Sequence, residues 1–127
     1  MYTNGYNVYK NNSVNYASKE QLLLMLVDGA VKFAKIARQA MVDKDIKKAH
    51  ENVVKTEDIF LELMATLDTS AGKWAENMFA VYRFINEKLF EANIKKDVAI
   101  MDDVLPLIED VRNIWYEAEE RARKANA

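Results

Sequence analysis

The stretch that decides the fold is residues 18–42, SKEQLLLMLVDGAVKFAKIARQAMV, in which apolar residues recur every three or four positions. This spacing is typical of an amphipathic helix. Ser18, with Gln21 three residues later, forms a capping-box signature, so we expect a helix over about residues 19–42. Upstream, residues 1–17 are rich in Asn, Tyr and Gly without a helical period, which predicts a flexible N-terminal tail.

The same helical period returns three more times along the chain. It predicts helices over about residues 46–66 and 73–93, and a fourth from Asp97 to about Lys124. The polar, Gly-containing stretch 68–73 separates the second helix from the third. The helix ends carry capping signals, namely Asp43 or Asp45 before the second helix, Asn93 as C-cap of the third with Lys95 and Lys96 after it, and Asp97 before the fourth.

Long helices joined by short turns pack against their neighbours in alternating directions. The predicted fold is therefore all-α, an antiparallel up-down-up-down helical bundle of four long helices over residues 18–127. Pro106 falls opposite the apolar stripe of the fourth helix, near Asp102 and Glu109. We expect it to form a solvent-facing kink without breaking the helix.

Composition excludes several classes of function. The chain has 127 residues, which suits one domain, and a net charge of −2 with both signs interspersed. No basic face gathers for nucleic acid. Cys is absent, which fits a reducing compartment. Neither a secretion signal nor an apolar run of membrane-spanning length is present. We expect a cytoplasmic protein without nucleic-acid binding or stable membrane insertion.

Motifs for chemistry are also missing. His50 is the only His, and Lys47 stands where a Glu-x-x-His metal site needs Glu. The position of His50 inside a helix does not fit a Ser-His-Asp triad, and no glycine-rich loop offers a phosphate cradle. We therefore predict no catalytic residue, metal, cofactor or small-molecule substrate. A small helical-bundle enzyme stays open as an alternative, and it predicts buried Arg or Lys around a pocket.

The apolar surfaces are wider than a bundle core needs. At about 100° per residue, each helix presents one stripe that should be buried: Leu22, Leu23, Leu26, Ala30, Phe33 and Ala37; Ile46, Val53, Phe60, Met64 and Leu67; Trp74, Met78, Val81, Ile85 and Leu89; Val104, Ile108, Val111, Trp115 and Ala118. Further apolar residues fall outside these stripes: Leu24, Val31, Val54, Leu61, Phe79, Phe84 and Phe90. They belong to a generous core, to the seam of a structural homodimer, or to a groove for an amphipathic helix of a partner.

Residues 17–30, ASKEQLLLMLVDGA, resemble the opening of the flagellin-specific export chaperone family FliS, which has an Ala-Ser-Pro cap, Gln-Leu, and then Leu-Tyr-Asp-Gly-Ala. Further landmarks of the family are matched in order by Asp45-Ile46, Ile59 to Leu63, Thr66-Leu67-Asp68 with Gly72, Tyr82, Leu89, Ala92-Asn93-Ile94, Asp97, Val104, Leu105, Leu107 and Trp115. Lys19, Lys73, Trp74 and the run 81–85 depart from the pattern. The resemblance spans about residues 2–118.

The resemblance implies a chaperone that binds the disordered C-terminal segment of flagellin in the cytoplasm, prevents premature polymerisation, and escorts flagellin to the flagellar export gate. It also implies that the tail folds back over the client-binding surface as a cap. The residues predicted to bind a partner are therefore Tyr6, Val8 and Tyr9 of the tail, with Leu24, Val31, Val54, Leu61, Phe79, Phe84 and Phe90 of the bundle.

Overall fold

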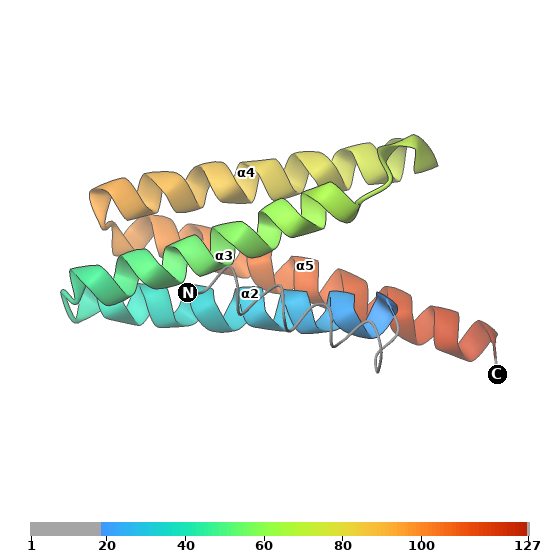
Figure 1. Ribbon diagram of the computed structural model, residues 1–127, viewed down its shortest axis with the longest axis horizontal. Coiled ribbons are helices and arrows are strands. Elements are labelled where there is room, and N and C mark those ends of the chain that lie inside the picture. The colour runs from blue at the N-terminus through green and yellow to red at the C-terminus, as the bar shows by residue number, and fades with distance from the viewer. Residues whose placement is uncertain (1–18, 127) are drawn as a thin grey trace.

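The computed structural model describes residues 19–126. In this part of the chain the helices are α2 (Lys19–Val42), α3 (Ile46–Thr66), α4 (Lys73–Lys95) and α5 (Val98–Ala125), with a 3-10 turn, η1 (Thr69–Ala71), between α3 and α4. Each helix packs against the helices before and after it in the chain, and α5 closes the ring against α2 (Figure 1). The predicted antiparallel four-helix bundle is confirmed.

The helix starts follow the predicted capping chemistry. The Asp45 carboxylate accepts the backbone N–H of Lys48 at 3.2 Å at the start of α3. At the start of α5, Asp97 accepts the N–H of Ala99 at 2.9 Å. Each carboxylate satisfies a donor that has no partner within its own helix. The predicted cap at Ser18 lies outside the described residues.

The end of α4 differs from the prediction. The helix continues past Asn93 to Lys95, and the C-cap is Lys96, whose left-handed backbone (φ 50°) ends the helix. Asn93 is buried inside the last turn instead. Its side chain forms a hydrogen bond with His50 of α3, so Asn93 connects two helices and does not cap one.

Pro106 lies inside α5 and is exposed to solvent, as predicted. The helix continues through it to Ala125. With 28 residues α5 is the longest helix, and its last turns extend past the neighbouring helices (Figure 1).

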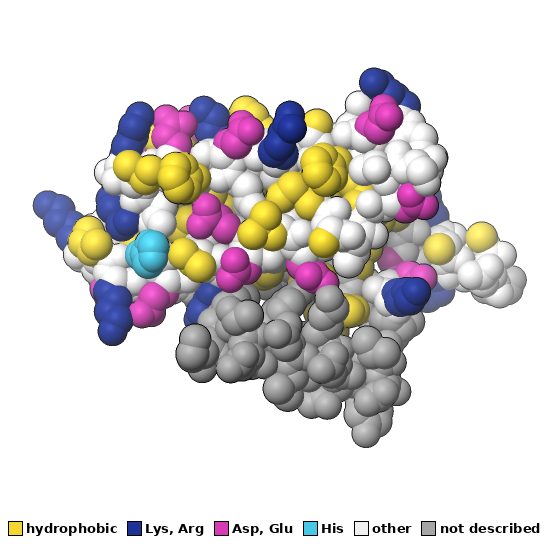
Figure 2. All heavy atoms as spheres, turned by 45° about the horizontal axis from the view of Figure 1, so that its top comes forward, with side chains coloured by type: hydrophobic (Ala, Val, Ile, Leu, Met, Phe, Trp, Pro, Cys, Tyr) yellow, Lys and Arg dark blue, Asp and Glu magenta, His cyan; other side chains and the backbone are white. Residues whose placement is uncertain are grey.

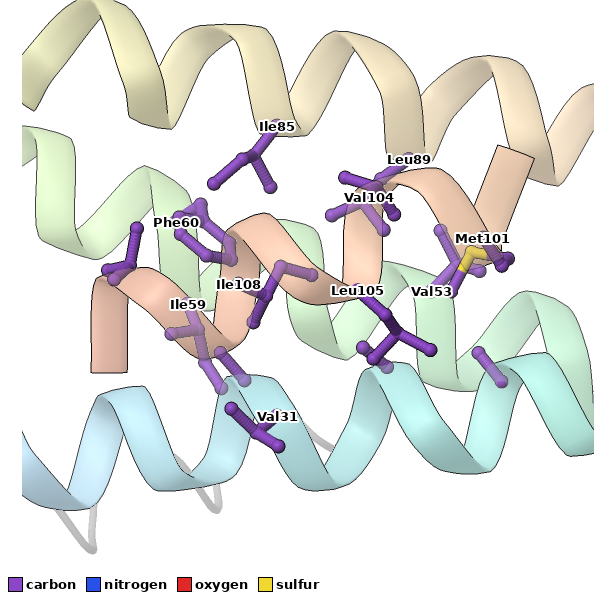
Figure 3. Close-up of a cluster of buried hydrophobic side chains, with 14 of the residues drawn as sticks. Val31, Val53, Ile59, Phe60, Ile85, Leu89, Met101, Val104, Leu105 and Ile108 are labelled. Atoms are coloured by element: carbon purple, nitrogen blue, oxygen red, sulfur yellow. The ribbon is translucent and has the colours of Figure 1, made fainter. Parts of the chain in front are cut away.

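The core draws on all four helices. Buried alanines dominate the contribution of α2: Ala30, Ala34, Ala37 and Ala40. Small side chains let the neighbouring helices approach closely, and larger side chains from the other helices fill the interior (Figure 3). Tyr82 is the largest fully buried side chain, and its hydroxyl accepts the indole N–H of Trp115 at 2.7 Å. Burial raises the pKa of Tyr82 to about 12.

Four residues predicted for the core are exposed: Ile46, Trp74, Val81 and Ala118. Ile46 and Trp74 occupy the first turns of their helices, and Ala118 lies on the last turns of α5, so fewer neighbouring helices surround them. The Trp74 ring makes an edge contact with Trp115, at 5.4 Å between centroids. Val81 lies outside the buried stripe of α4, on a side that the packing of this helix against α3 and α5 leaves exposed.

Candidate partner-binding site

An open groove of about 550 Å³ runs between α3 and α4, and we call it the α3/α4 groove. Its lining residues are Glu57, Asp58, Leu61 and Met64 from α3, with Arg83, Asn86, Glu87 and Phe90 from α4. Leu61 and Phe90 expose 56% and 59% of their surface, which is unusual for side chains of this size. Figure 2 looks onto this face and shows separate hydrophobic clusters with acidic side chains between them.

Two asparagines of α4 join this helix to α3, one at the groove and one beyond it. Asn86 donates its side-chain amide to the backbone oxygen of Glu57 at 3.2 Å. One heptad further along, the Asn93 amide lies 2.9 Å from Nδ1 of His50. Because the paired residues of α3 are also seven apart, the two hydrogen bonds repeat at the same helical register. These polar contacts therefore join α3 to α4 at two points one heptad apart.

The side-chain oxygens of the two asparagines differ in their hydrogen bonding. Oδ1 of Asn93 accepts the Lys96 ammonium at 2.6 Å. Oδ1 of Asn86 is buried and has no hydrogen-bond partner within residues 19–126. A buried acceptor without a partner costs about 1 to 3 kcal/mol. Asn86, which lines the groove, therefore has a side-chain oxygen that lacks a hydrogen-bond donor in the described residues.

Two carboxylates of the groove are half-buried. Burial raises the pKa of Glu57, and the neighbouring charge of Asp58 raises it further. Burial also raises the pKa of Asp58. Within the part of the chain that the structure describes, neither carboxylate forms an ion pair. Arg83, the cation of the groove lining, lies 3.9 Å from Glu87.

The predicted partner-binding residues separate into groups. Leu61 lines the α3/α4 groove from α3, and Phe90 lines it from α4. Val54 is half-buried and lines a hollow further along α3, together with His50. Phe79 is also half-buried but does not line the groove. Leu61 and Phe90 therefore form the exposed apolar centre of the candidate site.

Phe84 lies on the other side of α4, as the helical spacing predicts. It borders a smaller hollow of about 250 Å³ between α4 and α5, beside Ile100 and Leu107. The ammonium of Lys88 lies 5.7 Å from the centre of the Phe84 ring. Phe84 and Phe90 therefore belong to two different surfaces.

Val31 corrects the sequence interpretation. It is 5% exposed and belongs to the main core, where it stands beside Ile59 on the inner side of α2 (Figure 3). It is buried because α2 packs against both α3 and α5, so its buried face is wider than one stripe. Leu24, seven residues earlier, is half-buried. Tyr6, Val8 and Tyr9 lie outside the described residues.

Sequence reasoning missed the polar part of the groove. Asn86 and Asn93 follow Phe79 at steps of seven residues, on the same side of α4 as Phe90. Amides repeated along an otherwise apolar stripe indicate hydrogen bonds between helices. The carboxylates of Glu57 and Asp58 carry no such periodic signal.

The described residues offer little for other kinds of site. Within residues 19–126 no group of three or more His, Asp or Glu side chains is placed to hold a metal ion. His50 is exposed and lines the edge of a hollow on α3. The buried polar side chains of this region are Asn52, Thr56 and Asn93. None of the helices α2 to α5 has the length and apolar content needed to cross a membrane.

Fold and site together define a class: a single-domain antiparallel four-helix bundle that keeps an apolar groove open between two of its helices. A family profile described as "Flagellar protein FliS" matches residues 2–122. A flagellar secretion chaperone FliS from Bacillus subtilis is 36% identical over 121 residues, which cover 95% of this chain and 90% of the relative. A flagellar secretion chaperone FliS from Salmonella typhimurium is 30% identical over 129 residues and 96% of each chain.

A solved structure described as "Crystal structure of flagellar chaperone from bacteria" has the same fold. Its TM-score is 0.73 over 95% of this chain and 99% of the other, at 16% sequence identity. The chain belongs to the FliS family of flagellar proteins. The relatives carry the names of chaperones, not of enzymes.

Proposed function

We propose that this protein is a cytoplasmic flagellar secretion chaperone. It binds the disordered C-terminal segment of flagellin, prevents its premature polymerisation and delivers it to the flagellar export apparatus. Membership of the FliS family supports this role. The observation that carries it is the exposure of Leu61 and Phe90 on the two sides of the α3/α4 groove.

The groove has the form that an amphipathic helix needs for docking. Such a helix places apolar residues three, four and seven positions apart into a groove of this kind. Both Leu61 and Phe90 are more than half exposed, so covering them contributes about 1 to 3 kcal/mol together. A segment that is disordered alone folds on this surface, and its apolar face is then no longer free to pair with other copies of flagellin.

Titration calorimetry with a flagellin C-terminal segment tests the proposal. We expect a one-to-one complex with a clearly negative heat-capacity change. The variants Leu61→Asp and Phe90→Asp should weaken binding by at least about tenfold, because they place a charge where the client helix is apolar. Ile114→Asp is the matched control, since Ile114 is 40% exposed and lies on α5 outside the groove. Equal losses in all three variants would contradict docking in the groove.

Two alternatives predict different results. In a structural homodimer the exposed apolar residues pair with a second copy, so Leu61→Asp should lower the sedimentation coefficient of the free protein. A helical-bundle enzyme needs buried cations around a pocket. The buried residues of α2 to α5 include neither Lys nor Arg.

The tail forms a separate part of the proposal. Tyr6, Val8 and Tyr9 are the sizeable apolar residues of positions 4–12, and we propose that they cap the client surface in the free protein. Deleting residues 2–12 should then tighten client binding, by at most roughly a hundredfold. Titration of the same segment into full-length and shortened protein measures the change, and weaker binding after deletion would contradict a cap.

A further inference from the structure

The α3/α4 groove is negatively charged at its centre. Three carboxylates, Glu57, Asp58 and Glu87, line it together with one cation, Arg83. The guanidinium of Arg83 lies near Glu87, so Glu57 and Asp58 are left without an ion pair in the described part of the chain. Both are half-buried, where a charge interacts more strongly with a partner than it does in bulk water.

Asn93 shows what the same arrangement looks like when it is complete. The amide of Asn93 bridges to α3, and its Oδ1 accepts the ammonium of Lys96 at 2.6 Å. One heptad away, the amide of Asn86 also joins α4 to α3, through the backbone oxygen of Glu57 and not through a side chain, and its Oδ1 has no partner in residues 19–126. The polar groups between α3 and α4 are therefore less completely paired at Asn86, beside Glu57 and Asp58, than at Asn93.

We propose that the α3/α4 groove selects a client helix that carries a Lys or Arg about one turn from an apolar anchor residue. The anchor packs on Phe90 or Leu61, and the cation lies between the carboxylates of Glu57 and Asp58. This inference rests on the proposed function, because the client is the flagellin C-terminal segment. It adds a requirement for positive charge to a surface that otherwise recognises only apolar residues.

Charge complementarity favours this occupant over a neutral helix. A neutral apolar helix would cover Glu57 and Asp58 without offering them a partner, and burying an unpaired carboxylate is strongly unfavourable. A cation removes that penalty because it pairs with the two carboxylates. The groove therefore discriminates between amphipathic helices by the residue beside the anchor, as interfaces commonly do with charges.

The test uses the full-length protein and a synthetic flagellin C-terminal segment. Each Lys and Arg of the segment is replaced singly by Gln, and each peptide is titrated into the wild type and into the double variant Glu57→Gln/Asp58→Asn. Both substitutions keep side-chain size and remove charge. Glu76→Gln is the matched control, because Glu76 is exposed on α4 outside the groove. Circular dichroism verifies that each variant is folded.

We expect the double variant to bind the unmodified segment about tenfold more weakly than the wild type, while Glu76→Gln binds it unchanged. One replacement in the segment should produce the same loss with the wild type and almost none with the double variant, since both changes remove one interaction. If every replacement weakens binding equally to the wild type and to the double variant, Glu57 and Asp58 do not recognise a cation of the client. The inference is then wrong, although the proposed function stands. If the unmodified segment does not bind at all, the proposed function fails.

Two other occupants of the groove give distinct results, and either would overturn the inference. A second copy of the chain in the groove would make the double variant sediment differently from the wild type in the absence of client. The chain's own first 18 residues hold a single basic residue, Lys10. If the tail supplied the cation, Lys10→Gln would change the stability of the free wild type but not that of the double variant.

Discussion

The two seams α2/α5 and α3/α4 are built from different side chains. Across α2/α5, charged and polar groups pair at the surface: Arg38 with Asp102 at 2.5 Å, Lys35 with Glu109 at 3.9 Å, and Tyr116 with Asp28 at 2.6 Å. Across α3/α4, the contacts lie beneath the surface, and apolar side chains and unpaired carboxylates remain above them. One seam is therefore covered by paired polar groups, whereas the other leaves large apolar side chains exposed and two carboxylates without an ion pair in the described residues.

Phe60 and Leu61 give the sharpest test of the comparison, because they are adjacent in the chain. Phe60 is fully buried and Leu61 is 56% exposed in the groove. We expect Phe60→Ala to lower the free energy of unfolding by about 3 to 5 kcal/mol. Leu61→Ala should lower it by less than about 1 kcal/mol. Urea unfolding followed by circular dichroism measures both, and similar losses would mean that Leu61 is part of the core.

Tyr82→Phe tests the hydrogen bond that joins α4 to α5. The variant keeps the ring but removes the acceptor of the Trp115 indole N–H. The loss should be about 0.5 to 1.5 kcal/mol, the usual net contribution of one hydrogen bond. Urea unfolding followed by tryptophan fluorescence reports on stability and on the Trp115 environment together. Tyr116→Phe is the control, because it removes a hydrogen bond on the exposed surface. A larger loss of stability in Tyr116→Phe than in Tyr82→Phe would contradict the greater contribution expected of the buried hydrogen bond.

Arg38→Gln tests how much the polar pairs of the α2/α5 seam contribute. Both partners of the Arg38–Asp102 pair are partly exposed, so the loss of stability should be small. The loss should shrink in about 1 M salt, where charges are screened. Thermal unfolding at low and high salt measures it. Arg121→Gln, which breaks an ion pair within α5, should lower stability less. If the loss of stability in Arg38→Gln does not depend on salt, Arg38 stabilises the seam by packing and not by its charge.

Glu57→Gln should stabilise the free protein slightly at pH 7, by at most about 0.5 kcal/mol for a half-exposed group. Burial raises the pKa of Glu57 above its ordinary value of 4.5. Between the two pKa values the folded state therefore binds more protons than the unfolded state, so this group's contribution to stability falls as pH rises. The gain in stability from Glu57→Gln should disappear as the pH is lowered to the ordinary pKa of 4.5 and below. Thermal unfolding at pH 7 and pH 4 tests this.

Glu91→Gln is the control for that pH dependence. The Lys95 ammonium, with Lys88 nearby, lowers the pKa of Glu91. The charged Glu91 therefore stabilises the folded state at neutral pH, and this stabilisation is lost as the pH falls. A gain in stability at pH 7 from both substitutions would show that burial is not the cause at Glu57.

Much of the fold follows from the sequence because helix period and capping are local. Asp45 and Asp97 cap their helices by hydrogen bonds to residues two or three positions away. Burial was harder to predict, since it depends on which helix lies opposite. Val31 is buried because α2 has a neighbour on two sides, whereas Ile46 is exposed because it begins its helix at one end of the bundle.

The candidate site was predictable only in its apolar part. Leu61 and Phe90 lie outside the core stripes of their helices, so counting positions finds them without a structure. Counting does not show that they line one groove, nor that Asn86 lines it too, with a buried oxygen that has no partner in residues 19–126. These properties arise from the packing of two helices, and a periodic pattern in one helix contains no information about its neighbour's register.

The ring order of the helices has a consequence for how the protein is made. Most contacts join helices that follow each other in the chain, but the α2/α5 seam joins residues as far apart as Asp28 and Tyr116, 88 positions from each other. Contacts between successive helices form quickly, and closing the long loop between distant ones is slower. As the chain leaves the ribosome, α3 and α4 can pair before α5 has been synthesised. The two walls of the groove are then in place before the bundle is closed.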